Sequence, residues 1–86
     1  MKTTFAGRPL ALRRRVLEVL DRFDRLTADQ IAGQAYSKRL RFDYMPSCSV
    51  SQLVCVRHAL RRLARRGHVE HIGWRCRRKL WGRTDG

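Results

Sequence analysis

The spacing of apolar residues changes once along this chain, at Gly67, and no other feature constrains the fold more. Before Gly67, apolar side chains recur every three or four residues, which is the spacing of one face of a helix. After it, the segment HVEHIGW and then Leu80 and Trp81 indicate two short strands. Because a two-stranded hairpin is only marginally stable in water, it must pack on the helices. The sequence therefore predicts one α+β domain, with three helices first and a two-stranded β-hairpin last.

The first helix is predicted from Leu10 to about Asp24, and Pro9 suits its first turn. Its charged side chains face the solvent, whereas its apolar side chains form one stripe that can be buried. That stripe consists of Leu12, Val16, Val19, Leu20 and Phe23.

A capping box begins the second helix, because Thr27 is followed three residues later by Gln30. This helix is predicted from Ala28 to about Tyr36. We expect residues 37–48 to form a long connection, with a helical turn or a short extended piece at most, since Pro46 disfavours helix before it. Some of its side chains are expected to be partly buried: Leu40, Phe42, Tyr44 and Met45.

The third helix has a second capping box, formed by Ser49 and Gln52, and is predicted from Val50 to Arg66. Gly67 is typical of the residue that ends a helix. The inner face of the helix is expected to consist of Leu53, Val56, Leu60 and Leu63. Its last two turns hold four arginines, which is more basic charge than the helix terminus requires.

The hairpin is expected to rest on the helices through Val69, with Glu70 to Ile72 half buried. The run RCRRK, from Arg75 to Lys79, is interpreted as a basic turn or its flank. Trp74 and Trp81 are expected to close the core, because tryptophans in a small hairpin do so more often than they stack on bases.

The charge of the chain indicates what it binds. Twenty Lys and Arg residues against seven Asp and Glu residues give a formal net charge of +13. So much uncompensated charge favours a polyanionic partner, and nucleic acid is the expected one because neutralised phosphates release their counterions. Nearly all of the basic residues are Arg, which makes bidentate contacts with phosphate and guanine that Lys cannot make.

Two segments carry a resemblance to a known group of proteins. Residues 56–69, VRHALRRLARRGHV, are similar to the pattern V-R-x-A-L-x-x-L-x-x-x-G-x-V of GntR-type winged-helix regulators, and residues 26–32, LTADQIA, resemble the helix that precedes it. The resemblance implies a winged helix-turn-helix domain that binds double-stranded DNA. We expect this domain to cover residues 10–82, between a flexible basic arm at 1–9 and a tail at 83–86.

The outward face of the third helix would enter the major groove, where the N-terminal half of such a helix usually reaches base edges. Base contacts are expected from Ser51, Val54, Cys55 and His58, and a contact with guanine from Arg61 or Arg62. Phosphate contacts are expected from Arg57 and Arg65. The alternative for these arginines is a solvated helix surface, but this face lacks the acidic partners of such a surface.

The wing supplies a second set of expected DNA contacts. Its members would clamp a phosphate or enter the minor groove: Arg75, Arg77, Arg78 and Lys79. The alternative is a basic edge that prevents the strand from pairing with other chains.

Other chemistry has little support in the sequence. No phosphate-binding glycine loop and no protease or hydrolase motif occurs, so we expect neither an enzyme nor a cofactor or small-molecule ligand. The cysteines and histidines lack the paired spacing of a structural zinc site, and three cysteines are expected to be reduced thiols. No apolar run is long enough for a bilayer span or a secretory signal, so we expect a cytoplasmic, nucleoid-associated protein.

The expected role is that of a small transcriptional regulator, or of an accessory DNA-binding factor of a phage or mobile element. Two alternatives stay open. One is an RNA-binding or ribosome-associated winged helix, which the charge fits equally well. The other is a protein-interaction module with an acidic partner. No helix is evidently reserved for dimerisation, so the oligomeric state is open as well.

Overall fold

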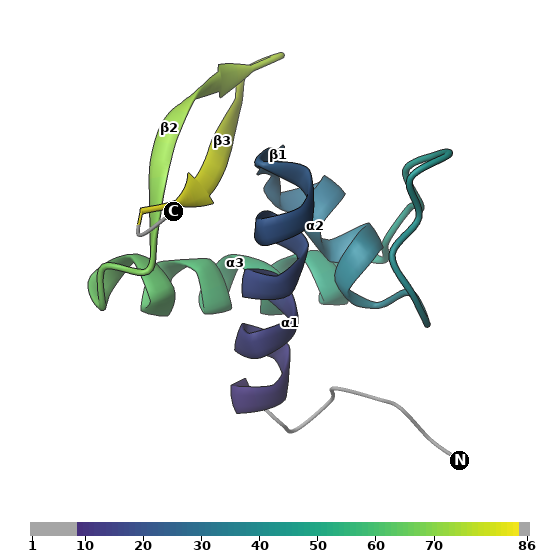
Figure 1. Cartoon of the computed structure of the whole chain (residues 1–86), viewed down its shortest axis with the longest axis horizontal. Coiled ribbons are helices and arrows are strands. Elements are labelled where there is room, and N and C mark those ends of the chain that lie inside the picture. Colours follow the sequence, from purple (N-terminus) through teal and green to yellow (C-terminus); the bar gives the residue numbers. More distant parts are fainter. Residues whose placement is uncertain (1–8, 85–86) are drawn as a thin grey trace.

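The computed structural model describes residues 9–84, and side chains from residue 11 onward. Its elements follow the order α1 (Pro9–Phe23), β1 (Arg25–Thr27), α2 (Ala28–Ala35), α3 (Val50–Arg65), β2 (Val69–Arg75) and β3 (Arg78–Arg83), as Figure 1 shows. Three helices and a three-stranded antiparallel sheet confirm the predicted α+β class and are compatible with a winged-helix fold. The predicted basic arm lies, apart from Pro9, outside the described residues, as do the last two residues of the predicted tail.

The sheet has three strands in the order β1-β3-β2, so the predicted two-stranded hairpin was incomplete. The additional strand, β1, pairs with β3 over three residues, with Leu26 opposite Trp81 and Thr27 opposite Leu80. Asp24, at a φ of 70°, turns the chain out of α1 and into this strand. Three residues are too few for an alternating pattern, and both Leu26 and Thr27 are buried, so no period of two was visible in the sequence.

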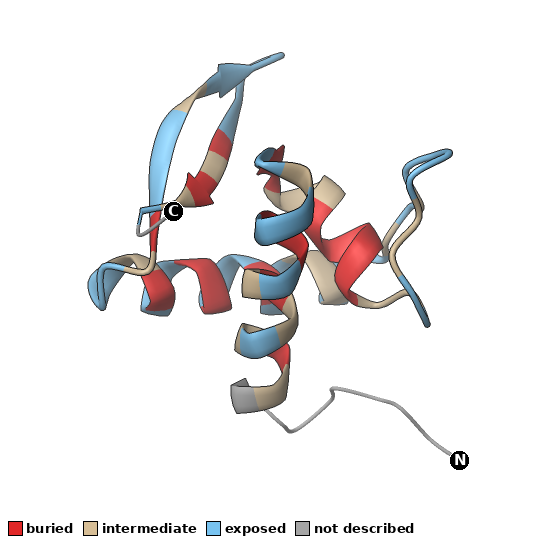
Figure 2. Ribbon diagram, viewed as in Figure 1, coloured by how far each residue is buried: buried red, intermediate tan, exposed pale blue. Residues whose placement is uncertain are grey.

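The core lies where the three helices meet, with α1 crossing α3 (Figure 2). The predicted stripe on α1 is confirmed, since four of its five residues are buried and Phe23 packs against them. The inner face of α3 is confirmed as well, although Leu53 is only half buried and Ala59 joins the buried set. Each fully buried aliphatic side chain contributes about 1.5–3 kcal/mol. None of the helices in the part of the chain described here is long and apolar enough to cross a bilayer.

Local hydrogen bonds position both ends of α3. The Oγ of Ser49 accepts from the amide of Gln52 at 3.1 Å, and Oε1 of Gln52 accepts from the amide of Ser49 at 3.0 Å, which completes the predicted capping box. At the other end, Gly67 adopts a φ of 81° and the amide of His68 donates to the carbonyl of Leu63 at 2.9 Å. This is a Schellman motif, so α3 stops sharply and the chain turns into β2.

The connection between α2 and α3 is held through its backbone. Gln34 is fully buried, and its side chain both donates to the carbonyl of Arg41 at 2.6 Å and accepts from the amide of Arg41 at 2.8 Å. Pro46 lies so close to α2 that a Cβ on Gly33 would stand 1.9 Å from its carbonyl oxygen. Some of its side chains also contact the helices, since Phe42 stacks on Phe23 of α1 with ring centroids 4.8 Å apart and the Sδ of Met45 accepts from Nε2 of Gln34 at 3.3 Å. Leu40 is half buried as predicted, but three predictions of partial burial were wrong: Phe42, Tyr44 and Met45 are exposed.

The outer part of the β2–β3 hairpin projects away from the helices (Figure 1), although Leu80 in the middle of β3 is buried and Arg78 reaches Asp29 of α2. Val69 is buried and Trp81 packs against the core, as predicted. Farther out, the prediction of a half-buried segment was wrong, since Glu70, His71 and Ile72 are exposed. The core position predicted for Trp74 was also wrong, since it is 62% exposed.

Candidate nucleic-acid interface

The outward face of α3 presents every residue that the sequence predicted for it. All eight are exposed: Ser51, Val54, Cys55, Arg57, His58, Arg61, Arg62 and Arg65. The helix contains no acidic residue, and within residues 9–84 none of its arginines forms an ion pair. A helical surface of this kind keeps its full positive charge for a partner.

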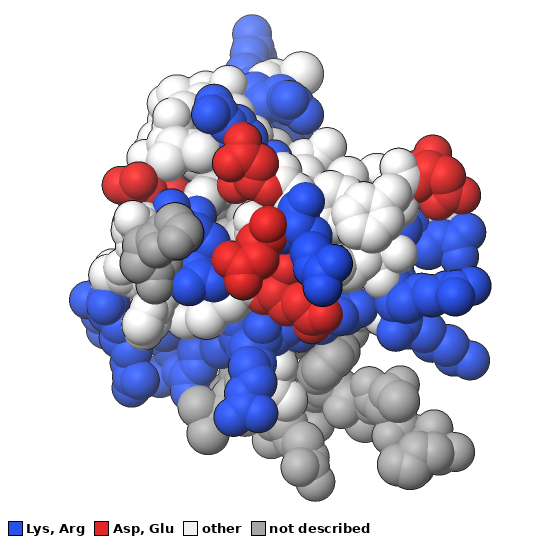
Figure 3. All heavy atoms as spheres, in the orientation of Figure 1, with Lys and Arg blue, Asp and Glu red and all other residues white. Residues whose placement is uncertain are grey.

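Acidic side chains gather elsewhere. On the face in Figure 3 many of them lie near the middle and others at the left and upper right, whereas basic side chains dominate the lower left and the right. On α1, Glu18 pairs with Arg15 at 2.8 Å and Asp21 pairs with Arg83 of β3 at 2.9 Å. The two carboxylates of α1 therefore form ion pairs on α1 and with the base of the sheet, whereas α3 has no such pair within the described residues.

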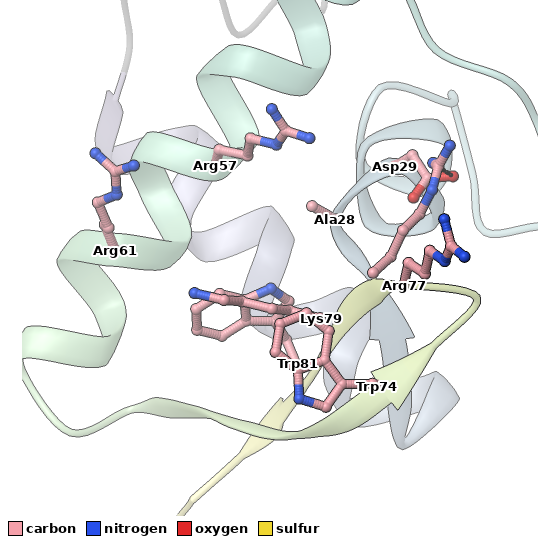
Figure 4. A pocket seen from close by; sticks show the side chains of 9 residues that line it. Ala28, Asp29, Arg57, Arg61, Trp74, Arg77, Lys79 and Trp81 are labelled. Carbon is pink, nitrogen blue, oxygen red and sulfur yellow. Dashed lines mark ion pairs between the residues drawn. The ribbon is translucent and has the colours of Figure 1, made fainter.

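A groove of about 400 Å³ separates α3 from the hairpin (Figure 4). It brings together residues from two elements that were predicted separately, namely α3 and the β2–β3 hairpin. Its walls consist of Ala28 and Asp29 from α2, Arg57 and Arg61 from α3, and Trp74, Arg77, Arg78, Lys79 and Trp81 from the hairpin. Five cationic side chains and a single carboxylate thus line one groove.

The other predicted residues do not line this groove. Ser51, Val54, His58 and Arg65 are spaced by three, four and seven residues along the open face of α3. Arg75 is exposed at the end of β2, opposite Arg78. The structure therefore divides the predicted site into an open helix face and a groove beside it.

Asp29 is the one acidic residue in the groove. Burial alone would raise the pKa of its carboxyl, but hydrogen bonds from the Thr27 hydroxyl and the Arg78 guanidinium outweigh this effect and lower the pKa below its ordinary value. Its carboxylate lies 2.7 Å from the hydroxyl of Thr27 and 2.9 Å from Arg78. Asp29 therefore stays charged and ties Arg78 of the hairpin to the first turn of α2.

The tip of the hairpin is a two-residue turn, Cys76–Arg77, inside the predicted basic turn. Both residues have positive φ, at 50° and 66°, as in a type I′ turn that usually contains Asn and Gly. Neither residue favours this conformation, which costs roughly 1–2 kcal/mol per residue. The turn places Arg77 at the rim of the groove (Figure 4), while Arg78 and Lys79 belong to β3 rather than to the turn.

Cys55 is connected to α2 through Tyr36. Burial raises the pKa of Tyr36 to about 12, and a hydrogen bond with the thiol of Cys55 adds to the effect. Burial also raises the pKa of the Cys48 thiol, with a smaller contribution from the charge of Asp29. No group of three or more His, Cys, Asp and Glu side chains is placed to hold a metal ion among the described residues.

Sequence reasoning missed the groove and two residues that define it. Asp29 was noticed only as a favourable charge in the first turn of α2, and its pairing with Arg78, 49 positions away, needs the tertiary structure. Trp74 was assigned to the core because nothing in the sequence shows how far the hairpin projects. Searches of family models, of curated proteins and of solved structures each find no match to this chain.

Proposed function

We propose that this chain is a winged-helix protein that binds double-stranded DNA, with α3 in the major groove and the β2–β3 hairpin beside it on the backbone. The observation that supports the proposal is the groove, which five cationic side chains from the helix and the hairpin line together. A major groove about 12 Å wide admits a helix, and 16 residues at about 1.5 Å each make α3 long enough to cross it.

The open face of α3 is proposed to contact bases. Ser51 and Val54 lie in its N-terminal half, His58 lies at its middle, and all three are exposed, which suits contacts with base edges and with a thymine methyl group. Arg62 lies outside the groove and is the better placed of the two arginines for guanine. Cys55 is a weaker candidate than the sequence indicated, because Tyr36 engages its thiol.

The groove itself is proposed to hold one strand of the duplex by its phosphates. Arg57 and Arg61 line it from α3, and Arg77 and Lys79 line it from the hairpin. Arg78 is held by Asp29 and mainly positions the hairpin. The protein would then act as a small regulator or an accessory factor on duplex DNA.

Fluorescence anisotropy across a salt series tests this function, with a labelled random duplex and a structured-RNA competitor. The observed binding constant should fall steeply with salt, with a logarithmic slope of about −0.9 for each phosphate neutralised, or roughly −4 for four groove cations. The duplex should outcompete the RNA, because the deep, narrow major groove of A-form RNA does not admit a helix. A flat salt response would contradict the proposal in favour of a protein partner, and stronger binding of RNA would contradict it in favour of an RNA partner.

A further inference from the structure

Trp74 is the residue in the groove that phosphate binding does not explain. Its side chain is 62% exposed, whereas Trp81, the other tryptophan, packs against the core. Holding a phosphate requires only cations, so an open indole ring beside them indicates a ligand that combines negative charge with a flat apolar ring. Nucleotides combine these two properties.

The ring of Trp74 is held in place without being covered. Its centroid lies 4.9 Å from that of His71, with the two rings at 87°, and Nε2 of His71 lies 2.7 Å from the carbonyl oxygen of Gly73. Lys79 is the cross-strand partner of Trp74, so a cation stands beside the ring on the same face of the hairpin. This pairing of an ordered aromatic ring with a cation is how single-stranded nucleic acid is bound.

The size of the groove restricts what can enter it. Its volume of about 400 Å³ lies within the range of small-molecule sites, which is roughly 300–1,000 Å³. A single nucleotide is a ligand of the size that such sites take. In Figure 4 the tryptophans lie on the hairpin side of the groove, across from Arg57 and Arg61 of α3.

We propose that the groove takes one unpaired nucleotide, with its base stacked on Trp74 and its phosphate held by Arg77 and Lys79. The protein then prefers duplex DNA that contains an unpaired base over a fully paired duplex of the same sequence. This preference rests on the proposed function, because the flanking duplex is held by α3.

The test compares two labelled DNAs, a fully paired duplex and the same duplex with one bulged base, by fluorescence anisotropy at one salt concentration. The bulged DNA should bind roughly 5- to 150-fold more tightly, which is the fold-change expected for one stacked base. Trp74→Ala should abolish this gain, so that this variant binds the bulged and the paired duplex with equal affinity. Trp74→Phe keeps an aromatic ring and should retain most of the gain.

Phe42→Ala is the matched control, because Phe42 is a similarly exposed aromatic residue on the α2–α3 connection, outside the groove. This variant should keep the full preference. A 2-aminopurine at the bulged position adds a direct signal, since stacking on Trp74 should quench its fluorescence in the unmodified protein and not in Trp74→Ala.

The outcomes separate this inference from the proposed function. Equal binding of the two DNAs, or an equal loss on both with Trp74→Ala, overturns the inference and leaves duplex binding intact. Failure to bind either DNA overturns the proposed function as well.

Discussion

Helices α1 and α3 are nearly equal in length and each contains four arginines, yet they present different surfaces. On α1, Arg15 pairs with Glu18 of the same helix, and Asp21 pairs with Arg83 of the sheet. On α3 there is no acidic residue, and its arginines face either the solvent or the groove beside the hairpin. The comparison teaches that the number of basic residues does not locate a binding surface. What distinguishes α3 is the lack of nearby acidic partners, together with a second basic element that faces it.

Charge reversal on α3 should lower duplex affinity much more than charge reversal on α1, and this is the largest difference that we expect. Arg57→Glu combined with Arg61→Glu removes two cations from the groove, and duplex affinity should fall at least about 30-fold if each charge-assisted contact with a phosphate is worth at least about 1 kcal/mol. Arg14→Glu combined with Arg22→Glu makes the same change in net charge on exposed positions of α1 and should cost only a few-fold. Both variants are measured by anisotropy against one duplex. Equal losses would show that net charge alone determines binding.

An acidic residue introduced on α3 should pair with one of its arginines, as on α1, and should weaken duplex binding. Val54 is 42% exposed and precedes Arg57 by three residues, so Val54→Glu reproduces the Arg15–Glu18 spacing in reverse order. We expect an affinity loss of about tenfold, because the new carboxylate both pairs with an arginine and repels phosphate. Val54→Gln is the control of equal shape and should lose much less. If the two variants bind equally well, charge pairing on α3 is irrelevant.

Glycine substitutions in the hairpin turn should stabilise the fold, and one of them should also weaken DNA binding. Arg77→Gly and Cys76→Gly each relieve a positive φ, so each should stabilise the fold by about 0.5–1 kcal/mol after the entropy of glycine is counted. Only Arg77→Gly removes a groove cation, so only this variant should weaken duplex binding. Denaturant unfolding and anisotropy on both proteins check this. An equal affinity for the two variants would show that Arg77 does not contact the DNA.

The smallest effect that we expect is on the pH dependence of stability, and it comes from the carboxyl group of Asp29. Its pKa in the folded protein lies below the reference value of 3.8, so its stabilising contribution is present above that value and is lost as the pH falls through the folded pKa. Between about pH 5 and pH 3 the unmodified protein should therefore lose more stability than Asp29→Asn, by less than about 1 kcal/mol because the ion pair is partly exposed. Parallel losses in the two proteins would mean that the contact with Arg78 does not stabilise the fold.

Local signals in the sequence predicted the three helices and the open face of α3. Capping boxes, Gly67 and the apolar spacing act within a few residues, and tertiary packing did not override them. Strand β1 was missed because it forms only by pairing with β3, more than fifty residues later. The groove was missed for the same kind of reason, since the pairing of Asp29 with Arg78 and the exposure of Trp74 depend on where the hairpin projects.

The most direct test of the central claim is an NMR titration of the isotope-labelled protein with a short DNA duplex, recorded as shifts of the backbone amides. If α3 and the hairpin form the interface, the largest shifts will fall on residues 51–65 and 74–79, and the amides of α1 will stay nearly unchanged. Shifts concentrated on α1 or on the α2–α3 connection, with α3 unchanged, would contradict the account.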